Sequence, residues 1–276
     1  MKVKNLLWSG CSFSAGSSFS QKVHWTSDYD EFIFSHPNLK KWFNPPYTIK
    51  NVKQQIRNIT FPVQLGHKIG CDLIKNFSVG GMGYPIHTRK IFSYLISNPD
   101  KLDFSETVVG IQLTSFQRDE VLRTHINGNI DFSFLDGMSG EDHARDYILK
   151  YWNPSYSVMK SLQELLIFKG WCESVGVKIH YFCFNGFMNE QILPYANSIK
   201  VMKSNINYAE LTHDYIDFPD LENIISKLEI IELPEMDGGT FITDGYHSDT
   251  HFSPEGHSNL SNILFDIFKN KLNYEI

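Results

Sequence analysis

Cysteine is scarce in this 276-residue sequence and occurs only at four scattered positions, Cys11, Cys71, Cys172 and Cys183. No C-x-x-C pair is present, so the sequence predicts neither a disulfide framework nor a zinc site. No apolar run approaches the ~20 residues of a bilayer-spanning helix. The N-terminal lysines are followed only by Leu6-Leu7-Trp8, which is far shorter than a secretory core. We therefore expect a reduced, cytoplasmic protein without a membrane span.

An excess of positive charge is also missing. Lysine and arginine number 25 against 31 aspartates and glutamates, which gives a net charge of -6. This balance gives no reason to expect nucleic acid or an anionic membrane as a partner. Internal repeats, low-complexity segments and linkers are absent too. With 42% hydrophobic residues, the sequence predicts a single globular domain over residues 1–276 with a substantial core.

Short apolar runs alternate with segments of helical spacing along the chain. Strands are predicted at Val3–Trp8, Asn76–Val79, Thr107–Leu113 and Val177–Phe184. Helices are predicted at Phe61–Ile69, Ile86–Ile96, Pro154–Val175 and Ser253–Leu272. This order is typical of an α/β fold with three α/β/α layers around a mostly parallel central sheet.

Three long, poorly periodic segments interrupt this alternation near residues 20–60, 119–147 and 185–240. We interpret them as loop insertions, the third with a short helix at Asp220–Leu228. Long irregular segments in a compact domain usually form lids or binding loops. Open α/β sheets bind ligands at the carboxyl ends of their strands, so we expect the insertions to surround that edge.

A turn rich in glycine and serine, Ser9-Gly10-Cys11-Ser12-Phe13-Ser14-Ala15-Gly16, follows the first predicted strand. A serine hydroxyl there becomes a nucleophile only if a histidine takes its proton and an acid orients that histidine. Asp249-Thr250-His251 supplies both groups, and residues two apart share a face in an extended segment. Asp244 and His247 remain an alternative pair. By the same alternation Cys11 should point away from the Ser12 side chain and pack inward.

Taken together, four blocks give the chain a family resemblance. Gly10-Cys11-Ser12, Asn76–Gly81 and Asp249–His257 occur in the order found in the SGNH (GDSL-type) hydrolases, which the chain resembles. The form G-C-S-F-x-x-G is similar to a subset common in bacterial and phage members. The third block departs from the family's Gly-x-Asn-Asp, because Leu113-Thr114-Ser115-Phe116 stands in its place.

The resemblance implies a flavodoxin-like sheet and an esterase or acyltransferase that needs no cofactor and no metal. It implies Ser12 as nucleophile, His251 as base and Asp249 as the acid that orients the base. The implied oxyanion and substrate-binding residues are Gly81, Thr114, Ser115 and Arg118. We expect a small-molecule or saccharide ester as substrate, since the insertions are aromatic and polar.

Two further readings stay open. The missing asparagine of the third block favours a non-catalytic carbohydrate-binding module on the same fold. The cluster of His247, Asp249, His251 and His257 has the ligand types of a metal site. That second hypothesis leaves Ser12 and Gly81 without a role.

Overall fold

The computed structural model describes most of the predicted strands and helices. The described residues are 1–11, 14, 44–45, 49–78, 83–113, 119–124, 130–135, 154–194, 220–234, 241–243 and 248–276. For 119–124, 130–135, 241–243 and 248–251 the description covers the backbone alone. Among the described helices, none combines the length and the hydropathy that crossing a membrane requires.

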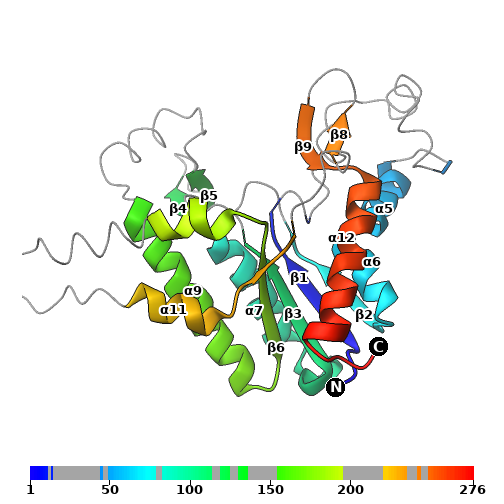
Figure 1. Cartoon of the computed structure of the whole chain (residues 1–276), viewed down its shortest axis with the longest axis horizontal. Helices are drawn as coiled ribbons and strands as arrows, with labels where there is room; N and C mark the ends of the chain where they lie inside the picture. Colours follow the sequence, from blue (N-terminus) through cyan, green and yellow to red (C-terminus); the bar gives the residue numbers. More distant parts are fainter. Residues whose placement is uncertain are drawn as a thin grey trace, which may run out of the picture. The chain divides into compact units, whose positions relative to one another are not determined.

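Five parallel strands form the central sheet (Figure 1). They are β1 (Asn5–Ser9), β2 (Leu73–Asn76), β3 (Thr107–Gln112), β6 (Lys178–Cys183) and β7 (Ile231–Glu232), in the order β2-β1-β3-β6-β7. This is the doubly wound, flavodoxin-like order, in which the direction of winding reverses beside the first strand. The predicted α/β fold with a parallel sheet is confirmed.

Helices flank the sheet, because right-handed crossovers place the connections between parallel strands on its faces. They are α5 (Ile49–Ile59), α6 (Phe61–Lys68), α7 (Tyr84–Ser97), α9 (Pro154–Ser174), α11 (Leu221–Leu228) and α12 (Pro254–Asp266). Short 3-10 turns occur at Pro99–Lys101 and Phe104–Glu106, and π-helical turns at Met188–Ile192 and Ile267–Lys271. Two antiparallel hairpins complete the described elements: β4 (Asp119–Thr124) with β5 (Ile130–Leu135), and β8 (Phe241–Thr243) with β9 (Ser248–Phe252).

The chain divides into two compact units. The first comprises Met1–Gly80, Tyr94–Gly110 and Met236–Ile276, and the second comprises Gly81–Ser93 and Ile111–Glu235. The prediction of one domain over the whole chain stays a prediction.

The first unit is built on β1, whose five residues are all buried. β1 pairs in parallel with β2 from Asn5 opposite Leu73 to Trp8 opposite Asn76. Helix α6 lies close to β2, since a Cβ on Gly66 would come within 2.6 Å of the Ile74 side chain. Figure 1 shows α12 alongside α6.

The second unit has its core between α9 and β6. Val158, Leu162 and Leu165 of α9 are completely buried, as is Tyr181 of β6. The Tyr181 hydroxyl donates a hydrogen bond of 2.6 Å to the Leu165 carbonyl. Helix α11 packs against α9 (Figure 1), and its buried residues Leu221, Ile224 and Leu228 share one helical face.

Two of the predictions are wrong in part. The second strand is Leu73–Asn76 rather than Asn76–Val79, and its last contact with β1 is the hydrogen bond from the Phe77 N–H to the Trp8 carbonyl. The insertion predicted at 20–60 is not irregular throughout, since α5 occupies its last quarter. Val52 and Ile56 of α5 are buried, and their spacing of four residues places them on one helical face.

The other two insertions also contain regular structure. The segment 119–147 includes the β4–β5 hairpin. The segment 185–240 includes the predicted helix, now α11, whose N-cap Asp220 accepts from the Asn223 N–H. It also supplies β7, a strand of only two residues that pairs with β6. So short a strand has no alternation from which it could be recognised.

Candidate active site

The structure places the predicted catalytic residues along the chain but describes few of their side chains. Ser12 comes three residues after the end of β1, between the described residues Cys11 and Ser14. Asp249 and His251 lie on β9, which is described by its backbone. The oxyanion and substrate-binding residues Gly81, Thr114, Ser115 and Arg118, and the alternative pair Asp244 and His247, lie outside the described residues. Their roles stay predictions.

Strand β9 is irregular at the predicted catalytic pair. Asp249 lies opposite Ile242 of β8, whereas Phe252 lies opposite the adjacent residue, Phe241. Two residues of β9, Thr250 and His251, therefore have no counterpart on β8. Residues two apart share a face only in a regular strand, so this bulge removes the reason to expect Asp249 and His251 on one face. Bulges redirect side chains and are frequent beside active sites.

Ser14, which follows β1 in the sequence, is held by hydrogen bonds from two side chains of β1 and β2. The Trp8 indole Nε1 donates to the Ser14 hydroxyl at 3.3 Å, and the Asn76 amide donates to the Ser14 carbonyl at 2.8 Å. Ser14 is completely buried, and Cys11 is 4% exposed. The prediction that Cys11 packs inward is confirmed. Buried residues, Cys11 and Ser14, thus lie on both sides of Ser12 in the sequence.

A row of four rings connects β1 with β9 inside the first unit. Trp8 meets Phe61 edge-on at 5.5 Å between ring centroids. Phe61 stacks on His257 at 5.9 Å, and His257 meets Phe252 edge-on at 5.7 Å. All four side chains are less than 2.5% exposed, so each contact lies in the core, where such pairs have specific preferred geometries.

The start of α12 is fixed by its own sequence. Ser253 is the N-cap, and its hydroxyl accepts from the Gly256 N–H at 3.1 Å. Pro254 follows at the first helical position, where proline is favoured. The Phe61 N–H donates to Nδ1 of His257 at 3.3 Å. An Nδ1 that accepts a hydrogen bond belongs to the tautomer with its proton on Nε2, which leaves no lone pair for a metal. His257 therefore drops out of the hypothetical metal site.

Other described groups do not form a metal site either. Within the described ranges, no three His, Cys, Asp or Glu side chains gather as a metal ion would require.

Burial raises the pKa of the Cys71, Cys172 and Cys183 thiols to about 12. Thiols with so high a pKa are poor nucleophiles near neutral pH, because the thiolate is the reactive form.

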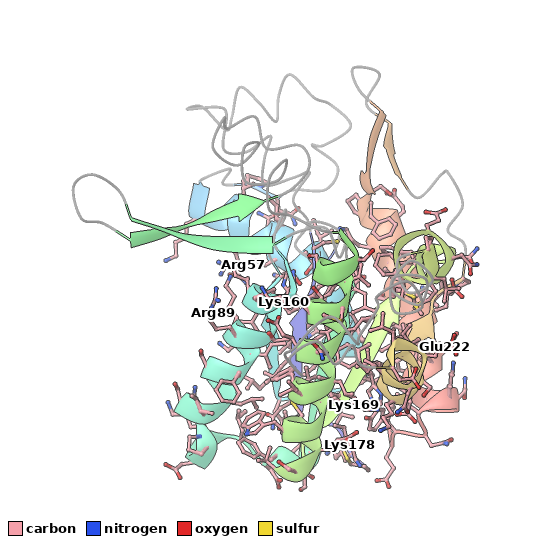
Figure 2. All side chains as sticks on the ribbon, turned by 90° about the vertical axis from the view of Figure 1, so that its left-hand side faces the viewer. Arg57, Arg89, Lys160, Lys169, Lys178 and Glu222 are labelled. Carbon is pink, nitrogen blue, oxygen red and sulfur yellow. The ribbon has the colours of Figure 1, made fainter. Side chains whose placement is uncertain are left out.

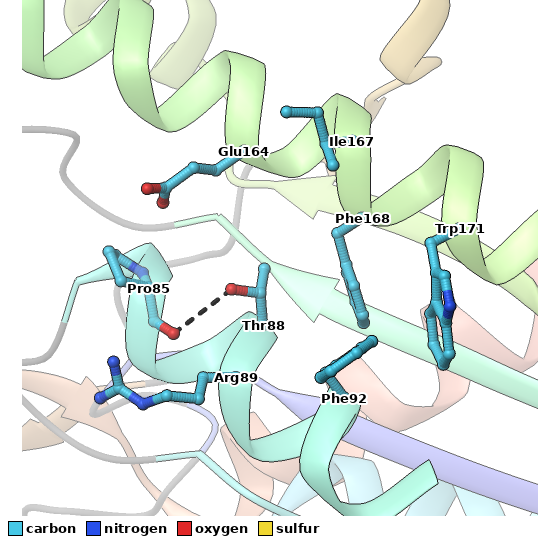
Figure 3. A pocket seen from close by; sticks show the side chains of 8 residues that line it. All are labelled: Pro85, Thr88, Arg89, Phe92, Glu164, Ile167, Phe168 and Trp171. Atoms are coloured by element: carbon cyan, nitrogen blue, oxygen red, sulfur yellow. Dashed lines mark hydrogen bonds between the residues drawn. The ribbon is translucent and has the colours of Figure 1, made fainter. Parts of the chain in front are cut away.

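A separate groove lies between α7 and α9 of the second unit, and sequence reasoning missed it. Its volume is about 430 Å³, and it is lined by Pro85, Thr88, Arg89, Phe92, Glu164, Ile167, Phe168 and Trp171 (Figure 3). Phe92 meets Trp171 edge-on at 4.6 Å. Phe92 is 37% exposed and Ile167 is 73% exposed. The signal that could have revealed the groove is the outward position of Phe92 on the predicted helix.

A charged cluster in the same unit has a structural role. Figure 2 shows Lys169 on α9. Its ammonium group donates to the Lys227 carbonyl at 2.7 Å and to the Glu229 carboxylate at 2.6 Å. The hydrogen bond from Lys169 holds the pKa of Glu229 below its ordinary value. Glu229 caps α11 in the left-handed region with φ at 52°, so Lys169 binds a helix C-terminus whose carbonyls need donors.

Comparison with known proteins gives only distant likenesses. No protein-family model and no curated protein matches the chain. Among solved structures, it is similar to a carbohydrate esterase at 13% identity and a TM-score of 0.46, over 99% of this chain and 70% of the other. It is similar to the acetyl xylan esterase Est2A of the rumen bacterium Butyrivibrio proteoclasticus at 13% identity and a TM-score of 0.46, over 100% of this chain and 66% of the other. The likeness to the psychrotrophic esterase EstA of Pseudoalteromonas sp. has 10% identity and a TM-score of 0.45, over 98% of this chain and 99% of the other. We base no functional argument on likenesses of this size.

Proposed function

We propose that the chain is a serine ester hydrolase in which Ser12 is the nucleophile, His251 the general base and Asp249 the residue that orients His251. The proposal combines the sequence blocks with the strand order. β1 is the strand beside which the winding of the sheet reverses, and ligands of open α/β sheets bind at the carboxyl ends of strands at this place. Ser12 follows that end of β1.

The row of rings is the observation that carries the proposal. Ser12 lies four residues after Trp8, and His251 immediately precedes Phe252. Trp8 and Phe252 are the two ends of the row, and each neighbouring pair of rings is less than 6 Å apart. The two segments that carry the proposed nucleophile and base thus branch from one packed cluster, although they lie more than 200 residues apart in the sequence.

The proposed reaction proceeds through an acyl-enzyme. Ser12 Oγ forms a bond to the acyl carbon while its proton passes to the imidazole of His251. The tetrahedral intermediate collapses with cleavage of the ester C–O bond, and the imidazolium gives its proton to the leaving alkoxide. A water molecule then attacks the acyl carbon and loses a proton to His251. The second tetrahedral intermediate collapses with cleavage of the bond between the acyl carbon and Ser12 Oγ, His251 returns the proton to Oγ, and the carboxylic acid leaves. Asp249 stabilises the imidazolium in both halves.

The negative charge of the intermediate needs hydrogen-bond donors. We assign this role to the N–H groups of Ser12 and Gly81 and to a hydroxyl of Thr114 or Ser115, which would replace the asparagine side chain. One such donor is worth ~10²–10³ in rate. To Arg118, which follows the third predicted strand, we assign the binding of an acyl or carboxylate group of the substrate. The aromatic, polar segment 20–60 favours a short acyl group on a saccharide.

Labelling with a fluorophosphonate tests the nucleophile without knowledge of the substrate. Intact-mass spectrometry should show one adduct on the wild type and none on Ser12→Ala. Labelling of His251→Ala should be at least ~10²-fold slower, in the range of a lost general base. His247→Ala is the matched control and should label at the wild-type rate. Slow labelling of His247→Ala alone would move the base to His247.

The absence of an adduct on folded wild-type protein would refute the hydrolase. The reading left in that case is a carbohydrate-binding module of the same fold, which should bind acetylated oligosaccharides in calorimetry without releasing acetate. If an adduct forms, acetate release with and without an added sugar alcohol separates hydrolysis from acyl transfer. In a transferase the alcohol takes the place of water and becomes the new ester.

A further inference from the structure

Asn76, the last residue of β2, uses both ends of its side-chain amide. Its Nδ2 donates to the Ser14 carbonyl at 2.8 Å and reaches the Thr60 hydroxyl at 3.4 Å. Its Oδ1 accepts from the Ser78 N–H at 3.1 Å. The Thr60 hydroxyl is itself fixed, because it donates to the Arg57 carbonyl at 2.7 Å. The amide therefore has a donor contact and an acceptor contact that lie in different segments of the chain.

Those two segments are the ones that lead to the proposed reaction centre. Ser14 comes two residues after Ser12, and Ser78 comes three residues before Gly81. Asn76 is thus bonded beside the proposed nucleophile and beside the proposed oxyanion donor. A mere turn-forming asparagine would need only the contact with Ser78, which is a local Asx-type bond. The bond to Ser14 spans 62 positions of the sequence and is not explained by the local turn.

We infer that Asn76 is a positioning residue for the reaction, an inference that rests on the proposed function of Ser12 and Gly81. At 2.8 Å, the bond from Asn76 to the Ser14 carbonyl is shorter than the 3.3 Å bond from Trp8 to the Ser14 hydroxyl. Attack by a serine requires reacting atoms within ~3–3.5 Å, and a displacement of ~1 Å can cost ~10² in rate. The bond from Asn76 fixes Ser14, two residues after the proposed nucleophile, to the end of β2, and on this inference it limits such displacements of Ser12.

The substitution Asn76→Asp separates the two contacts. Aspartate has the same shape and still accepts from the Ser78 N–H, but its carboxylate cannot donate to the Ser14 carbonyl. With p-nitrophenyl acetate as the probe, we expect kcat to fall about 10–100-fold while KM changes less than about threefold, because ground-state binding does not involve this bond. Fluorophosphonate labelling of Ser12 should slow by a similar factor. Asn76→Ala should lose at least as much activity.

Asn5→Ala is the matched control. Its amide also makes a buried hydrogen bond, to the Thr107 hydroxyl at 3.1 Å, but it lies at the opposite end of the β1–β2 pairing. Urea denaturation should show comparable losses of stability for Asn5→Ala and Asn76→Ala. Only the Asn76 variants should lose kcat. If Asn76→Ala does not fold, the isosteric Asn76→Asp decides.

The outcomes distinguish this inference from the proposed function. If wild-type protein neither hydrolyses the ester nor labels at Ser12, the proposed function fails and the inference falls with it. If the wild type reacts and Asn76→Asp reacts at the same rate, only the inference is overturned. If Asn5→Ala loses kcat as strongly as Asn76→Asp, the effect is one of general stability, and a positioning role is refuted.

Discussion

Gly110 lies where β3 passes Trp8 of β1 in the first unit, and its replacement tests the packing beside the proposed nucleophile turn. A Cβ built on Gly110 would overlap the Cε3 and Cζ3 atoms of the Trp8 ring. Trp8 is completely buried and contacts Phe61 edge-on, while its Nε1 is bonded to Ser14. Contacts thus hold the ring on several sides, and Gly110→Ala must displace either β3 or Trp8.

The expected cost follows from this geometry. Inserting a methyl group into a packed core costs ~1–3 kcal/mol through strain and backbone shifts. Against this, alanine stabilises by ~0.4–1 kcal/mol at a position that tolerates it, because it restricts the unfolded chain. Gly170 of α9 provides such a position, since a Cβ there would meet nothing within 4 Å. We expect Gly110→Ala to destabilise by about 2 kcal/mol and Gly170→Ala to stabilise by up to about 1 kcal/mol.

Equilibrium urea denaturation of the two variants, followed by circular dichroism, measures both effects on one scale. The two substitutions are chemically identical, so their difference reports the surroundings alone. The midpoint for Gly110→Ala should fall and that for Gly170→Ala should stay or rise. A loss below about 0.5 kcal/mol for Gly110→Ala would show that Trp8 is free to move. The assumption that a rigid ring supports the Ser12 turn would then be wrong.

Two further predictions concern the second unit. Burial, aided by the positive charge of Lys169, lowers the pKa of His180 from 6.5 to about 4. Between these two pH values the unfolded chain binds more protons at His180 than the folded chain does. The free energy of unfolding should therefore decrease by about 1–3 kcal/mol as the pH falls from 6.5 to 4. His180→Gln should flatten that part of a urea-denaturation pH profile, and an unchanged slope would refute the assignment. In the groove between α7 and α9, Ile167→Ser should change stability by less than about 0.5 kcal/mol because Ile167 is 73% exposed. Phe168→Ala, at a side chain only 6% exposed, should lower the free energy of unfolding by about 3–5 kcal/mol. A large loss of stability for Ile167→Ser would instead mean that the groove is covered in solution.

The sequence predicts those elements whose apolar residues form a continuous run or a long helical pattern. The predicted strand at Thr107–Leu113 and helix at Pro154–Val175 differ from β3 and α9 by one residue. In contrast, α5 was missed although its apolar residues recur at helical spacing, at Ile49, Val52, Ile56 and Ile59. The prolines, aromatic residues and polar residues that precede it make the whole segment 20–60 look irregular. Lysine, glutamine and arginine are good helix formers, so both propensity and the apolar face of α5 agree with its helical state.

The supports of the candidate site were not predictable for a different reason. The distant backbone partner of the Asn76 amide is the carbonyl of Ser14, which any residue type could have provided. The partner of the His257 imidazole is likewise a backbone N–H, that of Phe61, 196 positions away. Sequence motifs record side-chain identities, so they indicated Ser12 and His251. They do not show which backbone groups those side chains bind.

The three side chains that fix this corner of the first unit lie beside the proposed catalytic residues. A nucleophilic hydroxyl must stay open to substrate, so the rigidity it needs has to come from neighbours along the chain. Trp8 and Asn76 hold Ser14, while His257 links the start of α12 to Phe61. Each bond is buried or partly buried, where an unmatched polar group costs ~1–3 kcal/mol. Small displacements of Ser14 or of the start of α12 are therefore opposed by these contacts, and Asn76 ties Ser14 to the end of β2, from which the chain continues towards Gly81.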